Sequence, residues 1–113
     1  MKDSFYTAEQ QKGNTKGVNE TFLEKIRLRD KKVQSVQEIN FDNLVLPMIA
    51  VHKNPDDYPE YCVARIFTME IPTHVVIVKE SLQEIMEDIE KYAGMVFFDR
   101  RVDDPPSLVG VWV

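Results

Sequence analysis

One amphipathic helix placed among β-strands is the feature that most restricts how this chain can fold. Between Ser81 and Gly94, apolar residues recur at helical spacing and form a single stripe made of Leu82, Ile85, Met86, Ile89 and Ala93. Ser81 is a typical N-cap residue, and Gly94 is placed to end the helix. A helix with one apolar face has to bury that face against another layer of structure.

The segments around this helix have the composition of β-strands. Five stretches are rich in β-branched and aromatic residues and are bounded by turn residues: 48–53, 60–69, 74–78, 95–99 and 108–113. Within the second stretch Cys62, Ala64 and Ile66 share a small apolar face that suits the underside of a helix. The sequence therefore predicts an α+β fold with a mostly antiparallel sheet of about five strands, one amphipathic helix packed on it, and an N-terminal helix.

The first forty residues differ from the rest in composition. Residues 1–18 are polar with little periodicity, so we expect a flexible arm. Residues 19–40 form a basic segment in which a capping-box pattern and helix-like apolar spacing predict a helix over 21–37. The alternation of apolar and basic residues there also suits a short exposed strand, and this alternative stays open. Residues 41–113 are expected to form the α+β core domain.

Charge divides the chain in the same place. Residues 1–40 have eight cations and six anions, a net charge of +2, whereas residues 41–113 have six cations and thirteen anions, a net charge of −7. Such asymmetry bears on partners and association rates rather than on fold. The acidic side chains on the helix and in the following loop are candidates for binding a basic surface: Glu80, Glu84, Glu87, Asp88, Asp103 and Asp104. Solubility alone also explains them.

The composition favours a cytoplasmic location. The single cysteine, Cys62, fits a reducing compartment, and the N-terminal residues contain no apolar signal-peptide core. The longest apolar run, residues 44–51, is far shorter than the ~20 residues of a spanning helix. We therefore expect no membrane association.

The most distinctive run of the chain is "NPDDYP" at residues 54–59. Its aspartates invite a metal or acid–base role, but the spacing of a calcium loop is missing. Turn chemistry explains every residue type in it, since Asn-Pro starts a turn and Asp56 and Asp57 can close one by bonding to the backbone. We therefore predict that this run is a connector between two strands.

Other candidates for chemistry are weak. His52, Cys62 and His74 lie on three predicted strands without the paired spacing of a zinc site. Ser81 is accounted for as a helix cap and Ser107 as a turn residue, and no phosphate-binding glycine loop occurs. We expect a non-enzymatic protein with no metal, cofactor or catalytic residue. Trp112 is expected to lie in the core.

The basic run at 25–32 is a candidate for binding phosphate groups. Lys25, Arg27 and Arg29 are its candidate contact residues. The run lacks the aromatic residues that stack on single-stranded bases, and the whole chain is acidic, so nucleic-acid binding is the less favoured interpretation.

The pattern "NPDDYP…VARIF…PT", followed by "SLQEI" and "DDPP…VWV", resembles a group of small uncharacterised proteins. These proteins are encoded by phages and conjugative elements of Gram-positive bacteria. The resemblance covers about the last two-thirds of the chain and excludes residues 1–40. The matching residues are Asn54, Pro55, Asp57, Tyr58, Pro59, Val63, Ala64, Arg65, Phe67, Pro72, Thr73, Ser81, Leu82, Glu84, Asp103, Asp104, Pro105 and Trp112.

The resemblance implies a context rather than a residue-level activity. Small acidic proteins of such elements are often anti-defence factors, among which inhibitors of CRISPR RNA-guided nucleases are prominent. These nucleases hold guide and target in a positively charged channel, which an acidic protein can bind. We therefore expect an anti-CRISPR protein that binds the nuclease or its guide complex. An accessory protein of element maintenance or transfer, a homodimer and a small RNA-binding module stay open as alternatives.

Overall fold

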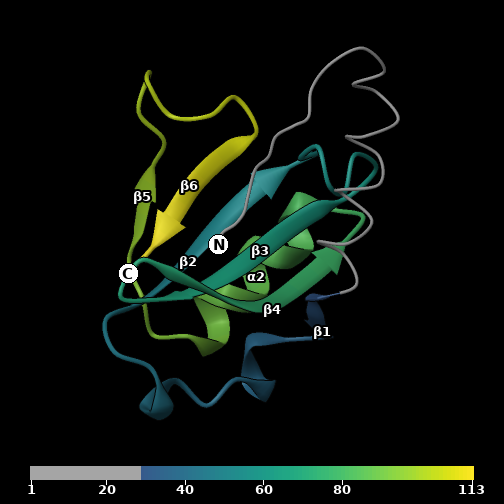
Figure 1. Ribbon diagram of the computed structural model, residues 1–113. Helices are drawn as coiled ribbons and strands as arrows, with labels where there is room; N and C mark the ends of the chain where they lie inside the picture. Colours follow the sequence, from purple (N-terminus) through teal and green to yellow (C-terminus); the bar gives the residue numbers. More distant parts are fainter. Residues whose placement is uncertain (1–28) are drawn as a thin grey trace, which may run out of the picture.

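The computed structural model describes residues 29–113. These residues form a six-stranded mixed sheet with one α-helix on one face (Figure 1). The strands are β1 (Lys31–Val33), β2 (Pro47–Lys53), β3 (Cys62–Thr68), β4 (Ile71–Lys79), β5 (Phe97–Asp99) and β6 (Leu108–Trp112). The α-helix is α2 (Leu82–Tyr92), and two 3₁₀-helices, η1 (Val36–Glu38) and η2 (Phe41–Asn43), connect β1 to β2.

The strand order across the sheet is β1-β4-β3-β2-β6-β5. Every neighbouring pair is antiparallel except β1 and β4, which are parallel. The predicted α+β class and the single helix on a mostly antiparallel sheet are thus confirmed. The expected number of about five strands is corrected to six.

The additional strand lies where the sequence predicted a helix. Residues 31–33 pair with residues 75–77 of β4, and residues 36–38 form a 3₁₀-helix. The predicted helix is therefore wrong from residue 31 to residue 37, and its part from 21 to 28 lies outside the described residues. Val33 faces Ile77 and is buried in the core, so pairing and burial outweigh the local helix pattern.

Helix α2 follows its sequence signals closely. The Ser81 hydroxyl accepts a hydrogen bond from the Glu84 backbone N–H, and Gly94 adopts the left-handed conformation (φ 67°) that ends the helix. Ile85 and Ile89 are buried against the sheet, where their core neighbours are Val36, Ile49, Ala64, Ile66, Ile77 and Trp112. The predicted core position of Trp112 is confirmed, because only 6% of it is exposed.

The edge strand β5 is held by close packing on β6. The rings of Phe97 and Trp112 lie 5.2 Å apart, and Phe97 also lies over Gly110. A Cβ atom at Gly110 would stand 2.4 Å from the Phe97 ring and 2.5 Å from the Phe98 carbonyl oxygen. Only glycine therefore allows β5 to approach β6 this closely.

The face of the sheet opposite α2 is more polar. Strand alternation places Val63 and Arg65 of β3 on this face, while Cys62 lies on the helix side. Tyr58, from the loop between β2 and β3, covers part of the face and is only 3% exposed. This side of the sheet also carries a polar cluster, described below.

Candidate functional site

The outer side of α2 carries the acidic residues that the sequence predicted as a contact surface. Glu84 and Glu87 are exposed, and Glu80 is exposed just before the helix. Because Ile85 and Ile89 point into the core, the carboxylates of Glu84 and Glu87 are turned away from the sheet. We call Glu80, Glu84 and Glu87 the α2 acidic face.

Two lysines reduce the charge of the α2 acidic face. Glu84 and Glu87 line a shallow polar hollow of about 300 Å³ together with Lys79, Lys91, Asp88, Gln34 and Tyr92. Lys79 donates a hydrogen bond from Nζ to Gln34 Oε1 at 3.3 Å. Three carboxylates against two ammonium groups leave the hollow with a net charge of −1. The surface is therefore a mixed pattern with an acidic excess.

Asp88 has a structural position that the sequence did not reveal. It is only partly exposed, and its carboxylate accepts hydrogen bonds from the Ser35 hydroxyl at 2.6 Å and from the Val36 backbone N–H at 2.8 Å. These bonds join the middle of α2 to the start of η1. Asp88 thus has a role in holding the N-terminal connection against the helix, apart from any contact with a partner.

Replacing Asp88 with alanine is expected to lower the free energy of unfolding by about 1–3 kcal/mol, because the buried Val36 N–H loses its acceptor. Urea denaturation measures this loss. Glu87→Ala on the exposed neighbouring position is the control, with an expected change within ~0.5 kcal/mol. Equal unfolding midpoints for the two variants would contradict this role of Asp88.

The loop acids do not join the α2 acidic face in one cluster. Asp103 and Asp104 lie in the loop between β5 and β6, which projects away from α2 (Figure 1). Strands β3 and β2 separate β4 from β6, so the strands leading to the two acidic groups lie about 14 Å apart. Asp104 also stabilises its own loop, since its carboxylate accepts a hydrogen bond from the Arg101 backbone N–H at 2.7 Å.

Of the three basic candidates, the structure describes Arg29. Lys25 and Arg27 lie outside the described residues, and Arg29 is exposed just before β1. Lys31 and Lys32 are exposed on β1, where lysine is a common means of protecting an edge strand. The ammonium group of Lys32 also lies 5.4 Å from the centre of the Tyr58 ring.

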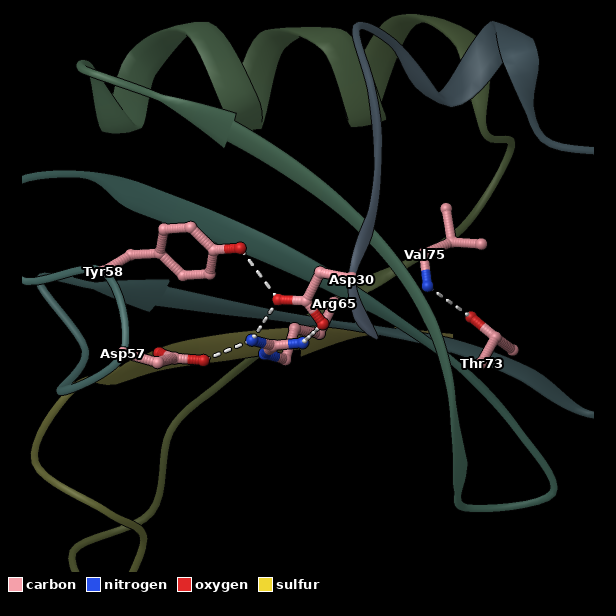
Figure 2. A network of polar contacts seen from close by, with 6 residues as sticks. All are labelled: Asp30, Asp57, Tyr58, Arg65, Thr73 and Val75. Carbon is pink, nitrogen blue, oxygen red and sulfur yellow. Dashed lines mark hydrogen bonds and ion pairs between the residues drawn. The ribbon is translucent and has the colours of Figure 1, made fainter. Parts of the chain in front are cut away.

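A buried polar cluster on the face opposite α2 was missed by the sequence analysis. Arg65 donates two hydrogen bonds to Asp30, from Nη1 to Oδ1 at 3.1 Å and from Nη2 to Oδ2 at 3.0 Å, and also pairs with Asp57. The Tyr58 hydroxyl donates to Asp30 Oδ2 at 2.8 Å. Figure 2 shows these four side chains meeting below the sheet, with α2 on the opposite side. We call Asp30, Asp57, Tyr58 and Arg65 the Arg65 cluster.

The pKa values of both Tyr58 and Arg65 are raised within the Arg65 cluster. The Asp30 side chain is 0% exposed and that of Arg65 is 17% exposed. Burial, followed by the hydrogen bond to Asp30, raises the pKa of Tyr58 to about 12, so its hydroxyl keeps the donated proton at neutral pH. Burial alone would lower the pKa of Arg65, but the bond to Asp30 and the charge of Asp57 outweigh it and raise this pKa.

The Arg65 cluster connects three parts of the chain. Asp30 precedes β1, Arg65 lies in β3, and Asp57 and Tyr58 lie in the loop that the sequence predicted as a connector. The connector is confirmed, since Tyr58 N–H bonds to the Pro55 carbonyl at 3.0 Å and Asn54 N–H to the Tyr61 carbonyl at 2.9 Å. Asp57, however, reaches across to Arg65, which turn chemistry alone did not suggest. The signal in the sequence was Asp30, the one acid within the run 25–32.

The zinc ligands considered from the sequence do not converge. Cys62 lies on the helix side of the sheet, whereas His52 lies on the opposite face near Arg65. No group of three metal-binding side chains occurs within residues 29–113. Burial raises the pKa of the Cys62 thiol, which keeps it protonated and unreactive.

His52 has a different partner. Its Nδ1 atom lies 2.9 Å from the Ser107 hydroxyl, across the β2–β6 pair. Burial, followed by the charge of Arg65, lowers the pKa of His52. The pair joins the end of β2 to the residue just before β6, and neither residue lines the polar hollow on α2.

No protein-family model, curated protein or solved structure matches this chain. Within the described part of the chain, no helix combines the length and apolar character that a membrane crossing needs.

Proposed function

We propose that this protein is a non-enzymatic interaction protein of a mobile genetic element, acting in the cytoplasm as an anti-CRISPR inhibitor. Its target would be an RNA-guided nuclease or the complex of that nuclease with its guide. The observation that carries the proposal is the α2 acidic face, in which Glu84 and Glu87 lie on a helix whose other side is buried and Glu80 is exposed just before it. The choice of an RNA-guided nuclease rests on the resemblance to proteins of phages and conjugative elements.

The physical basis is competition for cations. A nuclease channel binds phosphates through Lys and Arg, and a set of exposed carboxylates can bind the same side chains. Charge complementarity of this kind speeds encounter and makes the complex sensitive to salt. The Arg65 cluster would contribute indirectly, by keeping the sheet that supports α2 in one arrangement.

Reversing Glu80, Glu84 and Glu87 to lysine is expected to weaken binding to the nuclease about 100-fold, since each exposed ion pair contributes up to ~1 kcal/mol and repulsion replaces it. A pull-down with and without guide RNA, at low and high salt, measures binding, and a DNA cleavage assay measures inhibition. The matched control reverses three exposed acids elsewhere, Asp56, Glu60 and Asp99.

Two results would reject the proposal. Wild-type protein that forms no salt-sensitive complex and leaves cleavage intact would exclude a nuclease inhibitor. A variant with the reversed α2 acidic face that inhibits as well as the control would mean that these carboxylates serve solubility alone.

A further inference from the structure

An apolar groove opens beside the turn that joins β3 to β4. The groove has a volume of about 800 Å³, within the range of roughly 300–1,000 Å³ that ligand sites occupy. Its apolar lining comes from η2 and the start of β2, from the β3–β4 turn, and from the chain after α2. The lining includes Phe41, Leu46, Met48, Met69 and Met95, together with Val113, the residue after β6. Around it Val45, Leu46, Met69 and Ile71 are each more than half exposed.

Two of the most exposed apolar residues at the groove, Leu46 and Met69, have a strained backbone with positive φ. Leu46 has a φ of 49°, and the turn residues Met69 and Glu70 have φ values of 51° and 66°. A two-residue hairpin turn with positive φ at both positions favours Asn-Gly, and left-handed backbone is unfavourable for bulky residues. At positions 46 and 69, asparagine would adopt the left-handed conformation with less strain than leucine or methionine. Strained, exposed apolar residues of this kind point to a role in contact.

The charges at the groove indicate the chemistry of its occupant. Glu70 is the charged residue that lines it, and the exposed Asp42 follows Phe41 on η2. Among the described residues, no Lys, Arg or His lines the groove. The same surface on a second copy of this chain would bring another Glu70 and no cation, so self-association through it would gain no ion pair. A segment with apolar residues on one side and cations beside them fits both the lining and the charge.

We propose that this groove docks a basic amphipathic helix of a partner protein. The apolar side of such a helix would enter the groove through residues at positions i, i+3, i+4 and i+7, and its cations would face Glu70. Met48, Met69 and Met95 make the lining adaptable, because methionine side chains repack around different shapes. The groove lies at the C-terminal end of α2, whereas Glu80 and Glu84 lie at its beginning, so this surface is separate from the α2 acidic face.

The test uses the full chain and a fluorescent synthetic peptide of 18 residues with leucine at helical spacing and lysine elsewhere. Fluorescence anisotropy should show binding about tenfold or more tighter than for a scrambled peptide or one with glutamate in place of lysine. The double substitution Leu46→Asn, Met69→Asn should weaken binding about tenfold or more. Glu70→Lys should weaken it as well, whereas Glu84→Lys, a matched reversal on the α2 acidic face, should leave it within about twofold.

Thermal unfolding separates docking from a structural role of Leu46 and Met69. Asparagine tolerates the left-handed conformation, so the double variant should unfold at an equal or higher temperature than the wild type. Equal binding of the designed and scrambled peptides, undiminished binding by the double variant, or a lower unfolding temperature would each overturn the proposal. So would a wild-type dimer in sedimentation that is lost in the double variant, because a second copy would then occupy the groove. Reversing the charges of the α2 acidic face should leave peptide binding unchanged. The result of this test therefore does not depend on whether the protein inhibits a nuclease.

Discussion

Replacing Arg65 with methionine is expected to lower the free energy of unfolding by about 3–5 kcal/mol. The substitution removes both guanidinium hydrogen bonds from Asp30, whose side chain is 0% exposed, and leaves that carboxylate buried without an opposite charge. Methionine keeps a similar length of apolar side chain, so the loss reports mainly the charge. Since a domain of this kind is stable by about 5–15 kcal/mol in total, a large part of the variant would unfold under mild conditions.

Urea denaturation followed by fluorescence measures this loss, because Trp112 is the one tryptophan of the chain and lies in the core. Arg100→Met is the matched control, since Arg100 is exposed and should change stability by less than ~1 kcal/mol. The double variant Asp30→Asn, Arg65→Met should be more stable than Arg65→Met alone, because the fully buried carboxylate of Asp30 is then replaced by a neutral amide. A single variant as stable as the Arg100 control would show that the Arg65 cluster contributes little.

Replacing Ile89 with alanine is expected to lower the free energy of unfolding by about 2–5 kcal/mol. Ile89 is 0% exposed and lies at the centre of the contact between α2 and the sheet. Its truncation removes buried apolar contact and leaves a cavity that the surrounding β-branched side chains fill poorly. The small gain in helix propensity from alanine does not offset this loss.

A graded series tests the Ile89 prediction. Ile89→Val should cost about 0.5–1.5 kcal/mol, and Glu90→Ala on the exposed side of the same helix should change stability by less than ~0.5 kcal/mol. The slope of the urea transition should stay constant across the series, which shows that the same surface is exposed on unfolding. Equal losses for Ile89→Ala and Glu90→Ala would contradict the packing of α2 described above.

Local signals were sufficient to predict α2 and the strands next to it. The N-cap Ser81, the apolar stripe and the terminal Gly94 specify the helix within one short segment, and the alternation in β3 identifies its buried face. Strand β1 was mispredicted because its three residues form a strand only by pairing with residues 75–77, far along the chain. A segment this short carries too little local preference to compete with such pairing.

The candidate site was predictable to a similar degree. The exposure of Glu84 and Glu87 followed from helix periodicity, since both lie opposite the buried stripe. The structural use of Asp88 and the whole Arg65 cluster depended on contacts between segments distant in sequence, which no local pattern encodes. The groove at the β3–β4 turn was missed for the same reason, because its lining comes from separate segments.

The parallel pairing of β1 with β4 protects an edge of the sheet against aggregation. Without β1, the nine residues of β4, with β-branched residues at 75–78, would become the outermost strand and present unpaired backbone groups to other molecules. A cover of only three residues prevents this, and the salt-bridged Asp30 anchors it from the opposite face. Breaking that anchor would therefore expose β4 as a template for intermolecular sheet growth. Variants of the Arg65 cluster should aggregate from partly folded states in which β1 has left the sheet, in addition to unfolding.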